Sequence, residues 1–118
     1  MSYKLNGILV EVPQPTAIIT PDDGKQYFGG ETEAHILNII FPKVLQEGET
    51  NTNCKANYLR KEPQAVFTNV LSNTVTITKK TDQSMVGTFA FDLNYSDGNK
   101  EIIKITEGKF EIELLNMK

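Results

Sequence analysis

The chain has little of what catalysis most often uses. Its 118 residues include one cysteine, one histidine and no tryptophan. Because Cys54 is the single cysteine, the chain can form neither an intrachain disulfide nor a metal site made of several thiolates. A Ser-His-Asp triad or a Cys-His dyad would have to use His35, the single histidine. We therefore expect no catalytic residue, no metal site, no cofactor and no enzymatic activity. We interpret Cys54 as a small buried apolar side chain, and His35 as a partly buried strand residue bonded to a backbone or hydroxyl partner.

An excess of basic charge and a long hydrophobic run are also missing. Lysine and arginine total 12 against 15 acidic residues, which gives a net charge of -3, and the basic residues form no stripe. This composition offers no electrostatic basis for binding nucleic acid. The longest apolar stretch, ILNIIFPKVL, is interrupted by Asn38 and Pro42 and is too short to span a bilayer. The N-terminal segment MSYKLNGILVEV shows no signal-peptide pattern.

Helical periodicity is almost absent, and alternating β-branched and aromatic residues take its place. Turn residues recur along the whole length, which is typical of an antiparallel all-β domain. We predict a single all-β domain over residues 1–118, either a β-sandwich or a partly open barrel. The expected strands lie at about 2–12, 16–20, 25–29, 33–41, 55–60, 65–70, 73–79, 84–95, 100–106 and 109–115.

The second half of the chain predicts a C-terminal four-strand meander. Its three connections are a loop at Lys80–Asp82, a loop at Ser96–Gly98 and a two-residue turn at Glu107-Gly108. In this register Phe91 faces Ile103, and both Phe89 and Phe110 face Ile105. The large apolar residues then share one face, and the other face carries Thr74, Thr76, Thr78, Thr88, Asp92, Lys104, Glu111 and Glu113. In the first half, the stretch 33–41 is apolar on both faces and is expected to be a covered central strand.

Aromatic residues near strand ends are the candidate binding residues. They are Tyr27 and Phe28, which precede Gly29-Gly30, together with Tyr58 and Tyr95. Tyrosines at a rim suit contact with a glycan or a protein, because the ring stacks while the hydroxyl stays in water. The structural alternative is that these rings close the ends of the sheet.

Three motifs give the chain a resemblance to a known family. They are YKLNGILVEV near the start, HILNIIFPKVLQEGETNTNCKANY in the middle, and TVTITKKTDQSMVGTFAFDL followed by KITEGKF. In these the chain resembles small uncharacterised lipoprotein-type domains of Bacteroidota. The resemblance implies an all-β domain at the cell envelope, periplasmic or surface, tethered by a lipidated cysteine behind a leader. This chain shows neither feature, so we expect either that the leader has been removed or that the cytoplasm is the alternative location. The family supplies no catalytic residues.

Three functions therefore stay open. The first is a non-catalytic binding or structural β-module that contacts a glycan, a peptide or a protein. The second is a small soluble partner protein, such as an immunity or inhibitor protein or an accessory component of a larger assembly. The third is a lipocalin-like barrel for a small apolar ligand, which requires an internal cavity.

The phrase Gly87-Thr-Phe89 returns as Gly108-Lys-Phe110. We interpret both phrases as core, with Gly87 leaving room for a neighbouring large side chain. Phe89→Ala or Phe110→Ala should then lower the free energy of unfolding by about 3–5 kcal/mol, as for other buried aromatic truncations. Urea denaturation measures this, and a loss below about 1 kcal/mol would place the rings on the surface.

Overall fold

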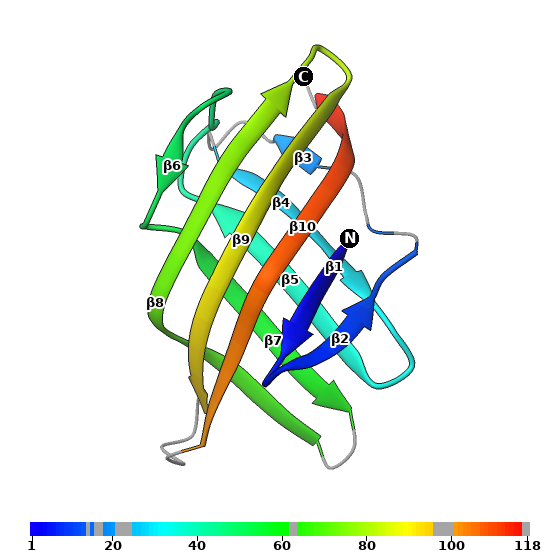
Figure 1. Ribbon diagram of the computed structural model, residues 1–118, viewed down its shortest axis with the longest axis vertical. Helices are drawn as coiled ribbons and strands as arrows, with labels where there is room; N and C mark the ends of the chain where they lie inside the picture. The colour runs from blue at the N-terminus through cyan, green and yellow to red at the C-terminus, as the bar shows by residue number, and fades with distance from the viewer. Residues whose placement is uncertain (14, 16–17, 21–24, 62–63, 96–100, 117–118) are drawn as a thin grey trace.

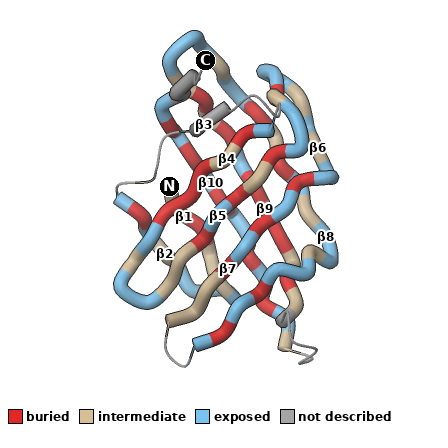
Figure 2. Tube along the Cα trace, turned by 180° about the vertical axis from the view of Figure 1, so that it is seen from behind, coloured by how far each residue is buried: buried red, intermediate tan, exposed pale blue. Residues whose placement is uncertain are grey.

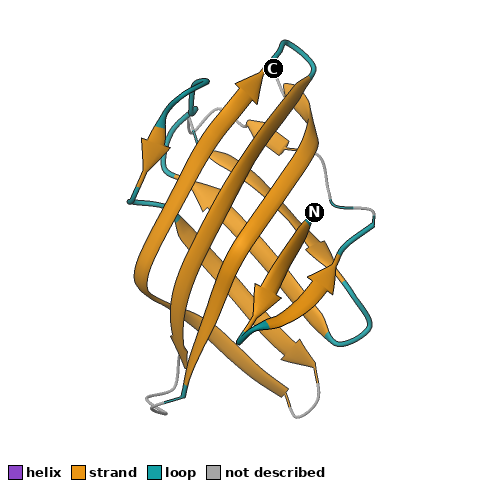
Figure 3. Cartoon of the chain, viewed as in Figure 1, coloured by secondary structure: helices purple, strands orange, loops and turns teal. Residues whose placement is uncertain are grey.

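The computed structural model describes the chain except residues 14, 16–17, 21–24, 62–63, 96–100 and 117–118 (Figure 1). The part described contains strands and loops without a helix (Figure 3), and no helix there could cross a membrane. The strands are β1 (Ser2–Leu5), β2 (Ile8–Glu11), β3 (Ile18–Thr20), β4 (Gln26–Glu31), β5 (His35–Phe41), β6 (Thr50–Asn51), β7 (Lys55–Lys61), β8 (Gln64–Lys80), β9 (Ser84–Tyr95) and β10 (Ile102–Asn116). The predicted all-β class is confirmed.

The strands form one sheet that curls into a partly open barrel. Its hydrogen-bonded order is β2-β1-β10-β3-β4-β5-β7-β8-β6, and β9 joins β8 to β10. Among the described strands the pairing is antiparallel except between β10 and β3, and Ile19 pairs with Tyr27 between β3 and β4. In Figure 1 the front layer (β1, β2, β8, β9 and β10) crosses over the back layer (β4, β5 and β7).

Side chains from both layers fill the space between them. The core comprises Tyr3, Val12, Phe28, Leu37, Ile39, Phe41, Leu45, Cys54, Ala56, Tyr58, Ala65, Phe67, Val75, Ile77, Met85, Phe89, Phe91, Leu93, Ile103, Ile105, Phe110 and Ile112. Phe110 of β10 bridges the layers, because its ring centroid lies 5.0 Å from that of Phe28 and 6.3 Å from that of Phe41. These separations are typical of favourable aromatic pairs. Seen from behind, buried positions alternate with exposed or half-buried ones over residues 36–41 of β5 and 55–59 of β7 (Figure 2).

The predicted division of the C-terminal strands into two faces is confirmed. The residues expected on the apolar face are buried, and those expected on the polar face are exposed or half-buried. The register is different, since Phe91 pairs with Ile105 and Phe89 pairs with Gly108. A shift of two residues keeps every side chain on its face, so the pattern alone could not detect it. The predicted loop at Ser96–Gly98 lies outside the described residues.

The predicted turn at Glu107-Gly108 is wrong. β10 runs straight through it as one strand, so the C-terminal meander has three strands, β8, β9 and β10, in place of four. Between Ile105 and Gly108 the strand carries one extra residue opposite β9, and Glu107 has a φ of 50°. A bulge and a two-residue turn both switch the inward positions from odd to even numbers. The sequence pattern therefore fits either geometry.

The structure also corrects two other predicted strand boundaries. Residues 2–12 form two strands, because Asn6-Gly7 has φ angles of 49° and 87° and makes a hairpin turn. Residues 65–70 and 73–79 form the single strand β8, whose register shifts near Asn69 and Ser72 bend it from β7 toward β9. β6 has no counterpart among the predicted strands.

The repeated phrase forms a reciprocal pair across β9 and β10. Gly87 lies opposite Phe110, and Gly108 lies opposite Phe89. A Cβ atom at Gly108 would come within 2.5 Å of the Phe89 ring, and one at Gly87 within 2.7 Å of the Phe110 ring. Each glycine therefore provides the space that the opposite ring fills, as predicted for Gly87.

Gly108→Ala should lower the free energy of unfolding by about 1–3 kcal/mol, because the new methyl group overpacks the Phe89 ring. Urea denaturation of the single variants and of the double variant with Phe89→Leu measures the coupling. The smaller leucine side chain should relieve part of the penalty. An equal penalty in both backgrounds would show that the ring does not occupy the space beside Gly108.

Candidate functional site

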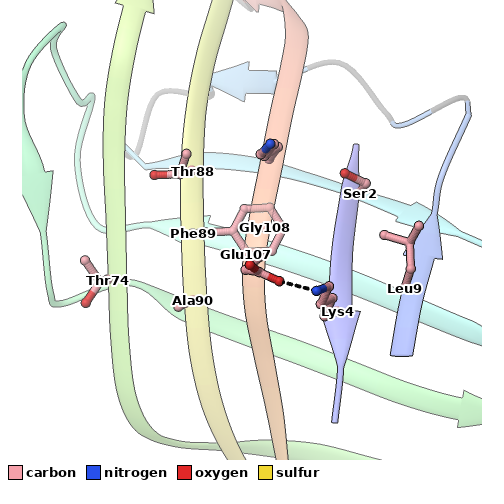
Figure 4. A pocket seen from close by; sticks show the side chains of 10 residues that line it. Ser2, Lys4, Leu9, Thr74, Thr88, Phe89, Ala90, Glu107 and Gly108 are labelled. Carbon is pink, nitrogen blue, oxygen red and sulfur yellow. Dashed lines mark ion pairs between the residues drawn. The ribbon is translucent and has the colours of Figure 1, made fainter. Parts of the chain in front are cut away.

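Two adjoining hollows on the outside of the front layer form the candidate site, which we call the outer groove. The first hollow has a volume of about 550 Å³ and is lined by Ser2, Lys4, Leu9, Thr74, Thr88, Phe89, Ala90, Glu107, Gly108 and Lys109 (Figure 4). The second has a volume of about 800 Å³ and is lined by Met1, Ser2, Glu11, Val12, Pro13, Thr78, Val86, Gly87, Thr88, Lys109, Phe110 and Glu111. Ser2, Thr88 and Lys109 line both hollows, so the two lie side by side.

The β10 bulge shapes the middle of the outer groove. It directs Thr106 and Glu107 to the outside. The Glu107 carboxylate forms an ion pair with Lys4 Nζ at 2.6 Å. Figure 4 shows this pair joining β10 to β1. The hydrogen bond from Lys4 lowers the pKa of Glu107 below its usual value, so this carboxyl is ionised near neutral pH.

The β1–β2 hairpin forms one wall of the outer groove and is held to β10 at its turn. The Asn6 N–H donates to the Lys104 carbonyl at 2.8 Å, and the Lys104 N–H donates to Asn6 Oδ1 at 2.8 Å. The polar side chains at the floor were predicted to face outward, but the sequence pattern did not identify them as a site. Treating Asn6-Gly7 as a hairpin turn would have placed Leu9 beside them.

The predicted aromatic candidates lie away from the outer groove. Phe28 is 3% exposed and Tyr58 is 1% exposed, so both rings pack inside the molecule, in line with the structural alternative. β4 continues through Gly29-Gly30 and pairs with β5, which turns Phe28 into the core. Tyr27 is half-buried on β4. The side chain of Tyr95 lies outside the described residues.

His35 and Tyr58 make a second polar feature at one end of the barrel. Their ring centroids are 5.4 Å apart, and both His35 Nδ1 and the Tyr58 hydroxyl are buried without a hydrogen-bond partner in the described part of the chain. The expectation that His35 bonds a backbone or hydroxyl group is therefore wrong for Nδ1. Burial lowers the pKa of His35 and raises that of Tyr58, because it disfavours the charged form of each.

An ion pair lies next to these two rings. Arg60 Nη1 donates to Glu101 Oε2 at 2.8 Å, and the Arg60 guanidinium lies 5.7 Å from the centroid of the Phe67 ring. The Arg60 charge is therefore balanced by a carboxylate and by an aromatic face. These two contacts explain how the charged Arg60 side chain can lie against the buried core.

Cys54 is a buried core residue, as predicted. Burial and the nearby Glu49 raise the pKa of its thiol to about 12, which keeps it protonated. Lys55 pairs with Ile40 at one end of the β5–β7 ladder and Arg60 pairs with His35 at the other. The six residue steps of extended chain from Cys54 to Arg60 span about 20 Å. His35 lies opposite Arg60, so the side chains of Cys54 and His35 do not form a dyad.

The described residues contain no cluster of three or more His, Cys, Asp or Glu side chains that could hold a metal ion. Comparisons with protein-family models, with curated proteins and with solved structures return no match for this chain. The resemblance to envelope lipoprotein-type domains accordingly stays a prediction, and so does the location that it implies.

Tyr58→Phe tests the unpaired hydroxyl. Removing a buried hydroxyl that has no partner should leave the free energy of unfolding unchanged or raise it by about 1 kcal/mol. Urea denaturation of the variant and the parent measures the difference. A loss of more than about 1 kcal/mol would show that the hydroxyl does form a hydrogen bond in solution.

Proposed function

We propose that this protein is a non-catalytic binding module that contacts a protein partner along the outer groove. The observation that carries the proposal is a hollow shared by β1, β2, β8, β9 and β10 outside a barrel whose interior is filled. The volumes of the two hollows fall in the range of ordinary ligand sites. The filled interior gives no comparable support to a lipocalin-like small-ligand barrel.

The lining of the outer groove favours a protein segment over a glycan. Sugar rings stack on exposed aromatic faces, but the two aromatic residues at the floor, Phe89 and Phe110, are 3% and 2% exposed. The accessible groups are hydroxyls such as that of Thr88 and charges of both signs, such as Lys109 and Glu111. Polar groups of this kind match the mixed hydrogen-bond donors and acceptors of a polypeptide.

The titratable groups in the outer groove support binding without catalysis. A general acid needs a raised carboxyl pKa, whereas the pKa of Glu107 is lowered by Lys4. His35 and Cys54 are absent from the residues that line the two hollows. The second candidate from the sequence, an immunity, inhibitor or accessory protein, would use a surface of the same kind.

A capture experiment with matched surface variants tests this proposal. The double variant Thr88→Arg/Lys109→Glu changes the size and the charge of the groove floor, and Asn57→Arg makes a comparable change at an exposed site on β7 of the back layer. Each tagged protein is incubated with lysate of the native host, and the captured proteins are quantified by mass spectrometry. We expect a specific protein to be captured by the parent and by Asn57→Arg, and at least about tenfold less by the groove variant.

Equal capture by the two variants would place the contact surface elsewhere and contradict the proposal. A glycan array run with the parent is the second arm. Binding to a glycan that is lost in the groove variant, without a captured protein, would overturn the assignment of a protein partner. Melting temperatures close to that of the parent confirm that the variants are folded.

A further inference from the structure

β2 is one end of the hydrogen-bonded strand order, and its outer edge is not paired with another described strand. Met1 and Val12 exchange two backbone hydrogen bonds, at 2.7 and 3.1 Å. In an antiparallel ladder such bonded pairs alternate along the strand, so Val10 and Ile8 also bond toward β1. The N–H and C=O groups of Leu9 and Glu11 therefore point away from the sheet, where a further strand could bind.

The side chains of β2 are unusually apolar for a free edge. Ile8 is 71% exposed and Leu9 is 58% exposed, the two highest values among the large hydrophobic residues whose burial the structure describes. Free edges are normally protected by lysine, proline or a bulge, because an apolar edge recruits other strands. The opposite end of the strand order, β6, is two polar residues long, Thr50–Asn51. The β2 edge is thus the one suited to strand addition.

The sequence of β2 is complementary to itself. Two antiparallel copies keep a common sheet face only if the facing residues have the same parity. Centring the pair on Leu9 satisfies this condition, because Ile8 then faces Val10 of the other copy and Leu9 faces Leu9. It also uses the outward N–H and C=O groups of Leu9. Glu11, which carries the only charge on the strand, falls opposite Gly7, so no like charges meet.

We propose that β2 pairs with β2 of a second copy of this chain, forming a symmetric dimer about an axis at Leu9. The interface is isologous, so the same patch serves both copies and closes the assembly at two subunits. The front layers then join into one sheet, and the two outer grooves, each lined by Leu9, lie on either side of the axis. The self-complementary register favours a second copy over an unrelated strand. This inference is independent of the proposed binding function.

Sedimentation velocity of the full chain tests the dimer. Concentrations from about 1 μM to about 1 mM cover dissociation constants from micromolar to millimolar. We expect the parent to shift from monomer to dimer with concentration. Leu9→Lys places two like charges face to face and should weaken association at least about tenfold. Leu71→Lys is the matched control, because Leu71 is 52% exposed on β8. It should associate like the parent.

The register is tested by oxidative cross-linking in a Cys54→Ala background, which removes the native thiol. Directly opposed residues of a bonded antiparallel pair have Cα atoms about 5.5 Å apart, within disulfide reach. Leu9→Cys should therefore form a covalent dimer, whereas Leu71→Cys should stay monomeric. A parent that is monomeric at every concentration, or association that Leu9→Lys leaves unchanged, would overturn the proposal. Circular dichroism and thermal melts confirm that each variant is folded.

Discussion

Reciprocal packing of glycine against phenylalanine across β9 and β10 is the constraint on which the rest of the structure depends. Gly87 accommodates the ring of Phe110, and Gly108 accommodates the ring of Phe89. Any side chain at either glycine would occupy the volume of the opposite ring. Because Phe110 also contacts Phe28 of the back layer, this pairing sets the distance at which the two layers meet. At this distance, side chains from both layers fill the space between them.

The same pairing explains how the outer surface is shaped. Gly108 can face inward only because a bulge inserts one residue after Ile105, and that bulge brings Glu107 to the outside beside Lys4. A solvent-exposed ion pair of this kind contributes little to stability, so its effect is mainly geometric. Together with Asn6 it holds the β1–β2 hairpin against β10. The hairpin then forms one side of the outer groove, and β2 lies at the edge of the sheet.

The sequence predicted which residues face inward better than it predicted how the strands connect. The alternation around Phe89, Phe91, Ile103 and Ile105 gave the correct buried face, because any register error of two residues preserves it. The change of parity at Glu107-Gly108 could not be resolved, since a turn and a bulge produce the same pattern. Tertiary pairing between β9 and β10, which a local pattern does not contain, decides between them.

The candidate site was harder to predict than the fold. The outer groove depends on the pairing of β1 with β10, and its polar residues, such as Thr88 and Lys109, have the sequence pattern of an ordinary solvated face. The aromatic candidates misled for a related reason: Gly29-Gly30 indicates a bend locally, yet pairing with β5 keeps β4 extended and buries Phe28. Exposure in both cases is set by neighbours distant in sequence.

Proton NMR of the folded protein tests the reciprocal pairing most directly. If Gly87 and Gly108 lie against the rings of Phe110 and Phe89, their Hα resonances will be shifted upfield by ring currents and will show nuclear Overhauser contacts to those rings. Contacts between Phe91 and Ile105 will accompany them. Contacts between Phe110 and Ile105, with unshifted glycine resonances, would instead show that the chain reverses at Glu107-Gly108 and would contradict this account.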